Sequence, residues 1–255
     1  MTSSESGKDS AGGRVAPLRR ITTWLVRPEH AESAAAGFAI EGDDRPLLTP
    51  DGRPVVVPSR TLAEAIVAEL RAQAEAKVPN IAAMPNLRLA ATAIDCVAAA
   101  RDATIDAVAA YGATELLCYR AEHPADLIER QHAAWQPLLD WAAARFDAPL
   151  VNAAGIMPRG QPDASLAALR AAVAAEDDLR LAALAFAVQT SGSLVVGLAM
   201  LHGRLNAAEA FALAELEETY QIEKWGEDSE ATARRAQRRR DLLAAATFMA
   251  LIKST

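Results

Sequence analysis

Residues 181–201, LAALAFAVQTSGSLVVGLAML, form the longest apolar stretch of near membrane-spanning length in this 255-residue chain. A membrane helix needs roughly 20 consecutive, predominantly apolar residues. The small and polar residues of 189–193, QTSGS, interrupt the run near its middle. We therefore interpret it as parts of two core helices, about Asp177–Gln189 and Leu194–Leu201, that meet at a small-residue turn. The sequence predicts no membrane insertion.

Helical patterns flank this core on both sides, with short breaks that carry Gly, Pro or Asn. Aromatic residues make up only 5% of the chain and alanine dominates its apolar residues, which favours helices packed through small side chains. The further helices are expected at about Asn86–Ala99, Asp102–Tyr111, Pro124–Phe146, Ala164–Ala175, Ala207–Trp225 and Ser229–Ile252.

The segment before these helices has a β pattern instead. A helix from about Ser59 to Ala76 follows it, with Ser59 or Thr61 as N-cap and Glu64 completing a capping box. A strand-like run at Glu115–Tyr119 is a candidate to return to the same sheet. Turn residues separate short strands, which predicts a meander of hairpins, at about Ile21–Val26, Gly37–Ile40, Pro46–Thr49 and Val55–Val57.

These patterns predict an α+β protein with three parts. Residues 1–20 are polar with few large apolar groups, so we expect a disordered tail that cannot repay the entropy of ordering. Residues 21–100 are expected to form a small N-terminal α+β domain. Residues 101–255 are expected to form a larger C-terminal helical domain.

Composition narrows the class of partner and the compartment. The net charge of −7 disfavours nucleic acid, whose affinity for proteins depends largely on cationic groups. Cys96 and Cys118 lack CxxC spacing, which indicates structural thiols in a reducing compartment. Residues 1–13 show no apolar core of a secretory signal. We therefore expect a bacterial cytoplasmic protein.

Motifs of common enzymes are missing from the sequence: it has no Walker A loop, no GxGxxG, no GxSxG and no HExxH. We therefore expect no cofactor and no metal. No pair at a usual zinc spacing occurs among the histidines, which are His30, His123, His132 and His202.

A basic run lies in the last predicted helix. At about 100° per residue its side chains spread around much of the helix, so we interpret the run as a solvated face. The arginines are Arg234, Arg235, Arg238, Arg239 and Arg240. Local ion pairing is offered by Glu227, Asp228, Glu230 and Asp241.

The predicted helix Ala207–Trp225 carries the candidate binding residues. On a helical wheel Glu217 falls on the apolar stripe, so we expect it to face inward and to be tied to an Arg, a backbone donor or a partner chain. Glu218 falls on a flank with Gln221 and Trp225, which is typical of a recognition surface. Core packing of Trp225 remains the alternative.

The end of this helix, residues 217–226, EETYQIEKWG, resembles the signature of the ATP12-type assembly chaperones that bind the α subunit of ATP synthase. Leu70 stands where that family suggests tryptophan, and Glu115 where it suggests aspartate. Other resembling stretches follow in colinear order: 43–50 DDRPLLTP, 57–66 VPSRTLAEAI, 92–95 TAID, 111–120 YGATELLCYR, 135–141 WQPLLDW, 155–162 GIMPRGQP and 191–198 SGSLVVGL.

The resemblance implies a small N-terminal domain with a sheet, followed by an orthogonal helical bundle. It implies a chaperone that is not an enzyme and that covers the β-facing surface of the unassembled α subunit. We expect the protein to be monomeric. Two alternatives stay open: an enzyme with an acidic pocket of Glu217, Asp95 and His132, and a homo-oligomeric scaffold. The expected binding residues are Glu217, Glu218, Gln221 and Trp225, with Asp43, Arg45 and Thr49 as a secondary set.

Overall fold

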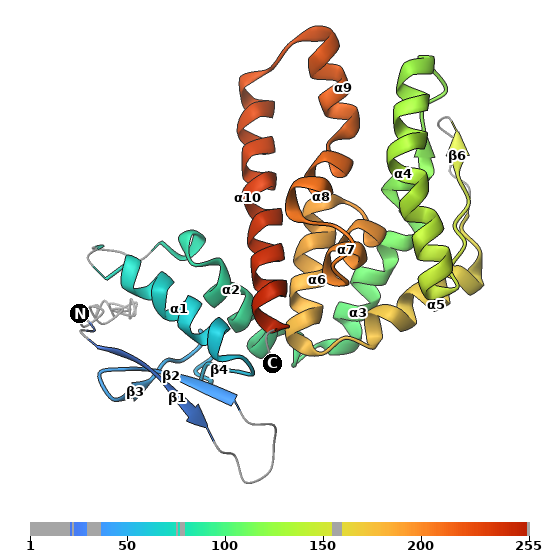
Figure 1. The fold of residues 1–255 in the computed structure, drawn as a ribbon. Helices are drawn as coiled ribbons and strands as arrows, with labels where there is room; N and C mark the ends of the chain where they lie inside the picture. The colour runs from blue at the N-terminus through green and yellow to red at the C-terminus, as the bar shows by residue number, and fades with distance from the viewer. Residues whose placement is uncertain are drawn as a thin grey trace, which may run out of the picture.

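The structure is a computed structural model that describes residues 21, 23–29, 37–74, 76, 80–154 and 160–253. A small sheet with its helices lies at one end, and the remaining helices rise from it as a larger body (Figure 1). The predicted α+β class is confirmed. The predicted tail, residues 1–20, lies outside the described residues, and the domain boundary near residue 100 stays a prediction.

The N-terminal sheet is antiparallel and centred on β2, which pairs with each of the other strands. Trp24 pairs with Gly42 at one end of the β1–β2 ladder. Gly42 is required there because a Cβ atom would lie 2.8 Å from Cγ2 of Ile21. The four predicted strands are confirmed, but their meander order is not, because β4 pairs with the central β2 and not with β3. The strands are β1 (Trp24–Glu29), β2 (Gly37–Gly42), β3 (Arg45–Pro46) and β4 (Val56–Val57).

Helix α1 (Arg60–Ala72) packs on this sheet, and α2 (Pro85–Thr92) connects it to the larger body. Of the two predicted N-caps, Ser59 and Thr61, the helix uses Ser59, whose Oγ accepts the backbone N–H of Leu62 at 3.2 Å. The predicted capping box does not form, because the Glu64 carboxylate instead receives Nε of Arg60 at 2.8 Å.

The chain between the sheet and the core runs through short turns and long helices. A π-helical turn (Ala93–Val97) and 3₁₀ turns (Ile81–Ala83, Ala110–Thr114 and Leu116–Cys118) interrupt it. The prediction that residues 115–119 return to the N-terminal sheet is wrong. The last two 3₁₀ turns carry the chain into the helical body, where β5 pairs in parallel with β6. The elements are α3 (Arg101–Ala109), β5 (Tyr119–Arg120), α4 (Ala125–Phe146), β6 (Ala153–Ala154) and α5 (Asp163–Ala174).

The apolar stretch 181–201 forms the centre of the core as two helices, as predicted. Helix α6 (Asp178–Ser191) ends at Gly192, whose φ of 74° is left-handed. Helix α7 (Leu194–Leu201) is buried along its whole length and begins at the N-cap Ser193. Among the described residues, no helix has both the length and the apolar character to cross a membrane.

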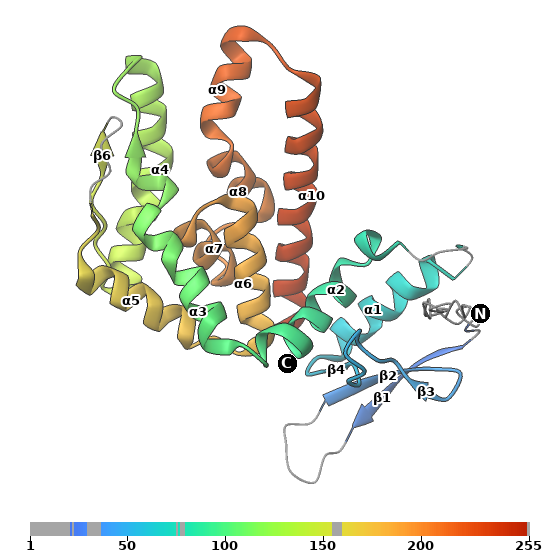
Figure 2. The same cartoon turned by 180° about the vertical axis from the view of Figure 1, so that it is seen from behind.

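The last part of the chain forms a helical hairpin at the end of the molecule away from the sheet (Figures 1 and 2). The single helix predicted over 207–225 is broken at Glu215, which has φ −108° and ψ 19°. The two pieces are α8 (Ala207–Ala214) and α9 (Leu216–Trp225). Helix α10 (Ser229–Ile252) has the predicted bounds and returns from the tip toward the sheet.

Candidate functional site

Helix α9 is held in place by polar contacts with α4. Arg130 donates both Nη groups to the carboxylate of Glu223, at 3.0 and 2.8 Å. Asp126 accepts the hydroxyl of Tyr220 at 2.7 Å and Nζ of Lys224 at 3.0 Å. The hydrogen bonds from Tyr220 and Lys224 lower the pKa of Asp126. These pairs orient α9 and leave its opposite face free.

Glu217 does not face inward, so the helical-wheel prediction is wrong. Its side chain is exposed, and its Oε1 accepts Nε2 of Gln131 at 2.6 Å. The buried positions of α9 are Leu216 and Tyr220. At about 100° per residue, Glu217 lies about 100° from Leu216 and about 60° from Tyr220. It is therefore at the edge of the buried stripe, where a helical wheel does not decide between burial and exposure.

The buried carboxylate of this region is Glu215, which sequence reasoning missed. It is 2% exposed and accepts Nη1 of Arg235 at 3.1 Å and Nη1 of Arg238 at 2.5 Å. Arg235 also donates Nη2 to Oγ1 of Thr219 at 2.9 Å. Part of the basic run therefore holds the α8–α9 break against α10 and is not merely a solvated face. The available signal was a pair of arginines three residues apart, Arg235 and Arg238, in the next helix.

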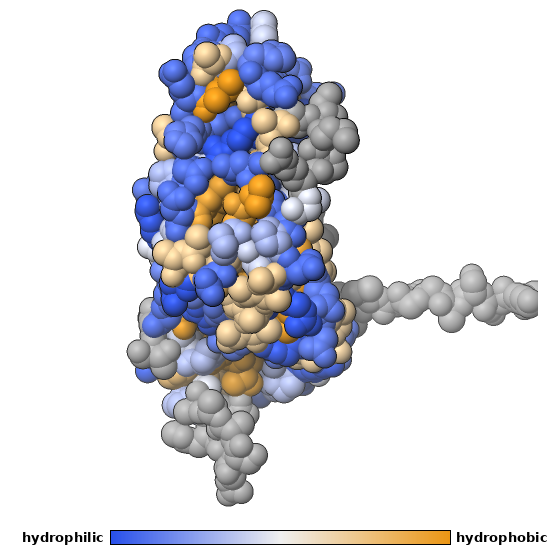
Figure 3. Space-filling model, turned by 90° about the vertical axis from the view of Figure 1, so that its right-hand side faces the viewer, coloured by the Kyte–Doolittle hydropathy of each residue, from blue (hydrophilic) through white to orange (hydrophobic). Residues whose placement is uncertain are grey.

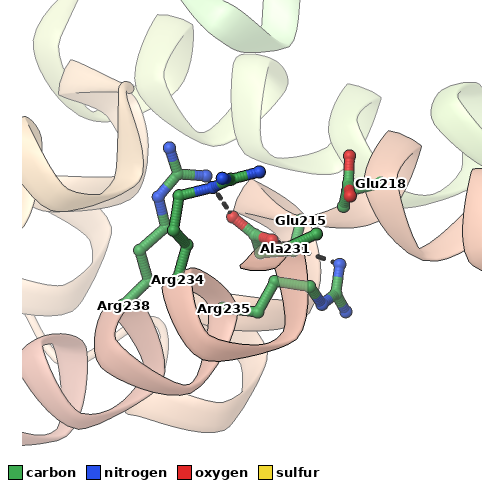
Figure 4. A pocket seen from close by; sticks show the side chains of 6 residues that line it. All are labelled: Glu215, Glu218, Ala231, Arg234, Arg235 and Arg238. Atoms are coloured by element: carbon green, nitrogen blue, oxygen red, sulfur yellow. Dashed lines mark hydrogen bonds and ion pairs between the residues drawn. The ribbon is translucent and has the colours of Figure 1, made fainter. Parts of the chain in front are cut away.

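Glu218, Gln221 and Trp225 form one stripe along α9, at spacings of three and four residues. Trp225 is 78% exposed, so the alternative of core packing is wrong. Within the described part of the chain, none of the three side chains makes a hydrogen bond or ion pair. Glu218 also lines a cavity of about 180 Å³ between α9 and α10 (Figure 4). The stripe therefore has polar and apolar groups available to a partner.

The secondary set lies on the N-terminal sheet and its loops, away from α9 (Figures 1 and 2). Oδ1 of Asp43 accepts the backbone N–H of Thr23 at 2.9 Å, which ties the β2–β3 turn to the start of β1. Thr49 is 6% exposed and donates its hydroxyl to Oδ1 of Asp95 at 2.7 Å, so it holds the loop after β3. The side chain of Arg45 is exposed.

The residues of the alternative acidic pocket are not brought together. Asp95 is bound to the loop after β3 through Thr49, whereas Glu217 is bound to α4 through Gln131. His132 is exposed on α4. No cluster of three or more potential metal ligands occurs among the described residues.

Comparison with known proteins agrees with the fold and with these motifs. Crystalline Atp12 from Paracoccus denitrificans is 39% identical, with a TM-score of 0.84 over 91% of this chain and 97% of that chain. This chain belongs to the ATP12 chaperone family. The family model for the ATP12 chaperone protein matches residues 25–143. The expected assembly chaperone of ATP synthase is thereby confirmed at the level of the family.

Two further structures extend the family match. A point mutant of Paracoccus denitrificans Atp12p is 39% identical, with a TM-score of 0.85 over 92% of this chain and 97% of that chain. The Atu1473 protein from Agrobacterium tumefaciens is 38% identical, with a TM-score of 0.83 over 90% of this chain and 84% of that chain. The ATP12 fold therefore extends through α9 and α10, beyond the range matched by the family model.

Proposed function

We propose that this ATP12-family chaperone binds the unassembled α subunit of ATP synthase and covers its β-facing surface until β replaces it. The observation that carries the proposal is the exposed Trp225 at the end of the Glu218–Gln221 stripe. A tryptophan surrounded by polar groups is a frequent anchor of protein interfaces. Helix α4 contacts the face of α9 opposite the stripe, through Arg130 and Asp126. The stripe can therefore bind without a prior conformational change.

The size of the anchor suits a complex that must later dissociate. Burial of a tryptophan removes roughly 150–250 Å² from water. At about 25 cal/mol per Å², covering the exposed part of Trp225 contributes ~3–5 kcal/mol. A micromolar complex needs about 8 kcal/mol, so further contacts are required. Glu218 and Gln221 are the nearest candidates, and Glu217 can join them by releasing Gln131.

The rest of the surface suits intermittent contact with a client. Seen from the side of α4 and β6, small apolar patches are separated by hydrophilic surface (Figure 3). Such a mixture resembles exchangeable interfaces, which are only about as apolar as ordinary protein surface. We propose that Arg45 adds a contact at the sheet end, with Asp43 and Thr49 shaping its hairpin and loop.

Co-purification tests the proposal. Tagged chaperone is expressed with α, with β, and with both subunits. It should retain α when β is absent, and co-expression of β should release α from it. Failure to retain α refutes the proposed function. We expect the chaperone to act as a monomer in the bacterial cytoplasm without any catalysed reaction, and light scattering of the free protein tests the monomer against the homo-oligomeric scaffold.

Variants locate the surface. Trp225→Ala should weaken α capture by roughly 10- to 100-fold, the range expected of an interface anchor. Glu218→Lys should weaken capture with little change in melting temperature, because the carboxylate has no partner in the described part of the chain. Glu64→Lys on α1 is the matched control, since Glu64 is exposed and its one ion pair among the described residues is with Arg60. Capture equal to that of the control would remove the α9 stripe from the site.

A further inference from the structure

The cavity between α9 and α10 is lined mainly by charged side chains (Figure 4). It has a volume of about 180 Å³, and its walls come from two helices that meet at the tip of the hairpin. Glu218 stands on the α9 wall, apart from the arginines of the α10 wall. The lining residues are Glu215, Glu218, Ala231, Arg234, Arg235 and Arg238.

The α10 wall of this cavity carries an excess of positive charge. The single carboxylate of Glu215 receives both Arg235 and Arg238, which leaves one positive charge uncompensated in that cluster. Arg234 adds a further guanidinium on the same wall. Arg234 and Arg238 are one helical turn apart, and like charges at this spacing destabilise a helix. Nearby negative charge on a partner would relieve this repulsion.

Of the acidic neighbours expected to neutralise the arginines, one pairs only weakly with Arg234, and two bond to other groups. Glu230 lies 3.7 Å from Arg234, but both side chains are exposed, so the pair is weak. Asp228 accepts the backbone N–H of Ala231 as the N-cap of α10. Asp241 accepts Nε2 of Gln237. The guanidinium groups at the mouth of the cavity therefore remain open to another anion.

Two features determine which anion fits. The whole chain has a net charge of −7, so an acidic polypeptide is repelled by most of the molecule and attracted to this strip. Arginine presents a planar fork of donors that matches a carboxylate in two parallel hydrogen bonds. Arg234 and Arg238 have side chains that are 67% and 56% exposed, so both can reach an approaching group.

We propose that Arg234 and Arg238 form a receptor for an acidic side chain, Asp or Glu, of the bound client polypeptide. Glu215 is the positioning residue, because it holds Arg238 and Arg235 against the α8–α9 break. The client's carboxylate enters between the α10 arginines, while the Trp225 stripe holds its apolar surface. The identity of the client rests on the proposed function; the recognition of a carboxylate by this cavity does not.

The first experiment measures capture of the α subunit at several NaCl concentrations. Arg234→Glu should weaken capture about tenfold at low salt, and the loss should shrink as salt screens the charge. Arg240→Glu is the matched control: Arg240 lies on the same helix and bonds to Gln237, but it does not line the cavity. Its effect should stay below about twofold. Equal effects of the two variants would overturn the receptor and leave the proposed function standing.

The second experiment needs no client. The peptide Glu-Glu-Glu is titrated into the full-length protein, and the arginine side-chain Nε–Hε signals are followed by NMR. Signals of Arg234 and Arg238 should shift, and that of Arg60 on α1 should not. If wild-type protein fails to capture α, the proposed function is refuted, and this titration alone tests whether the two arginines bind a carboxylate. Shifts at the two arginines then support the receptor, and their absence overturns it.

Discussion

The strongest stability prediction concerns Glu215, the buried carboxylate between α8 and α9. Glu215→Ala removes two charge-assisted hydrogen bonds, from Arg235 and from Arg238. Removing one partner of a fully buried ion pair costs about 3–5 kcal/mol. The side chain of Arg238 is 56% exposed and can turn to solvent. That of Arg235 is 18% exposed and keeps its hydrogen bond to Thr219 and its contact with the Phe211 ring. We therefore expect a loss of ~2–3 kcal/mol.

Urea unfolding followed by circular dichroism measures this loss, and thermal melting should show a fall of roughly 4–12 °C for a chain of this size. Glu230→Ala is the matched control, because Glu230 is exposed and sits 3.7 Å from Arg234. It should cost less than about 0.5 kcal/mol. If Glu215→Ala costs no more than the control, the buried ion pair does not hold the break against α10.

Two further predictions concern the core. Gly197→Ala should cost ~1–3 kcal/mol in urea unfolding, because its Cβ would lie 2.5 Å from Cγ2 of Val188. Gly160→Ala should be close to neutral, because the added Cβ meets no atom of the described residues within 4 Å. Glu115 is fully buried, and desolvation raises its pKa above the usual 4.5, although Ser193 and backbone N–H groups donate to it. The folded state therefore binds this proton at a higher pH than the unfolded state does, so the contribution of Glu115 to stability should rise as pH falls from above its folded pKa toward 4.5. Urea unfolding measures the free energy of unfolding of wild type and of Glu115→Gln across that pH range. The value for wild type minus that for Glu115→Gln should increase as the pH falls; a difference that stays constant with pH would contradict the raised pKa.

The elements that the sequence predicted well are those with strong local signals. The end of α6 could be placed because Gly192 is followed by the N-cap Ser193, and α10 because an acidic N-cap precedes a long unbroken helical pattern. The pairing of β5 with β6 could not be predicted, because each strand has two residues and no local pattern selects its partner.

The candidate site was predicted less well. A helical wheel assumes an unbroken helix, so it did not find Glu215, whose arginine partners lie 20 and 23 residues further along the chain. It placed Glu217 inward because that residue lies at the edge of the stripe formed by Leu216 and Tyr220, where the wheel does not decide between burial and exposure. The stripe of Glu218, Gln221 and Trp225 was found correctly because all three follow the break and keep their mutual spacing.

The supports of α9 explain how an exposed tryptophan can remain in place at the tip of a hairpin. Asp126 and Arg130 of α4 hold the last turns of α9, and Glu215 holds its start against α10. Both ends of the ten-residue helix are thus tied to different neighbours. Binding then orders few additional groups, and the conformational entropy that association normally costs is reduced. A client held by such a rigid surface can be bound through a small area and still be released to a partner that covers more of it.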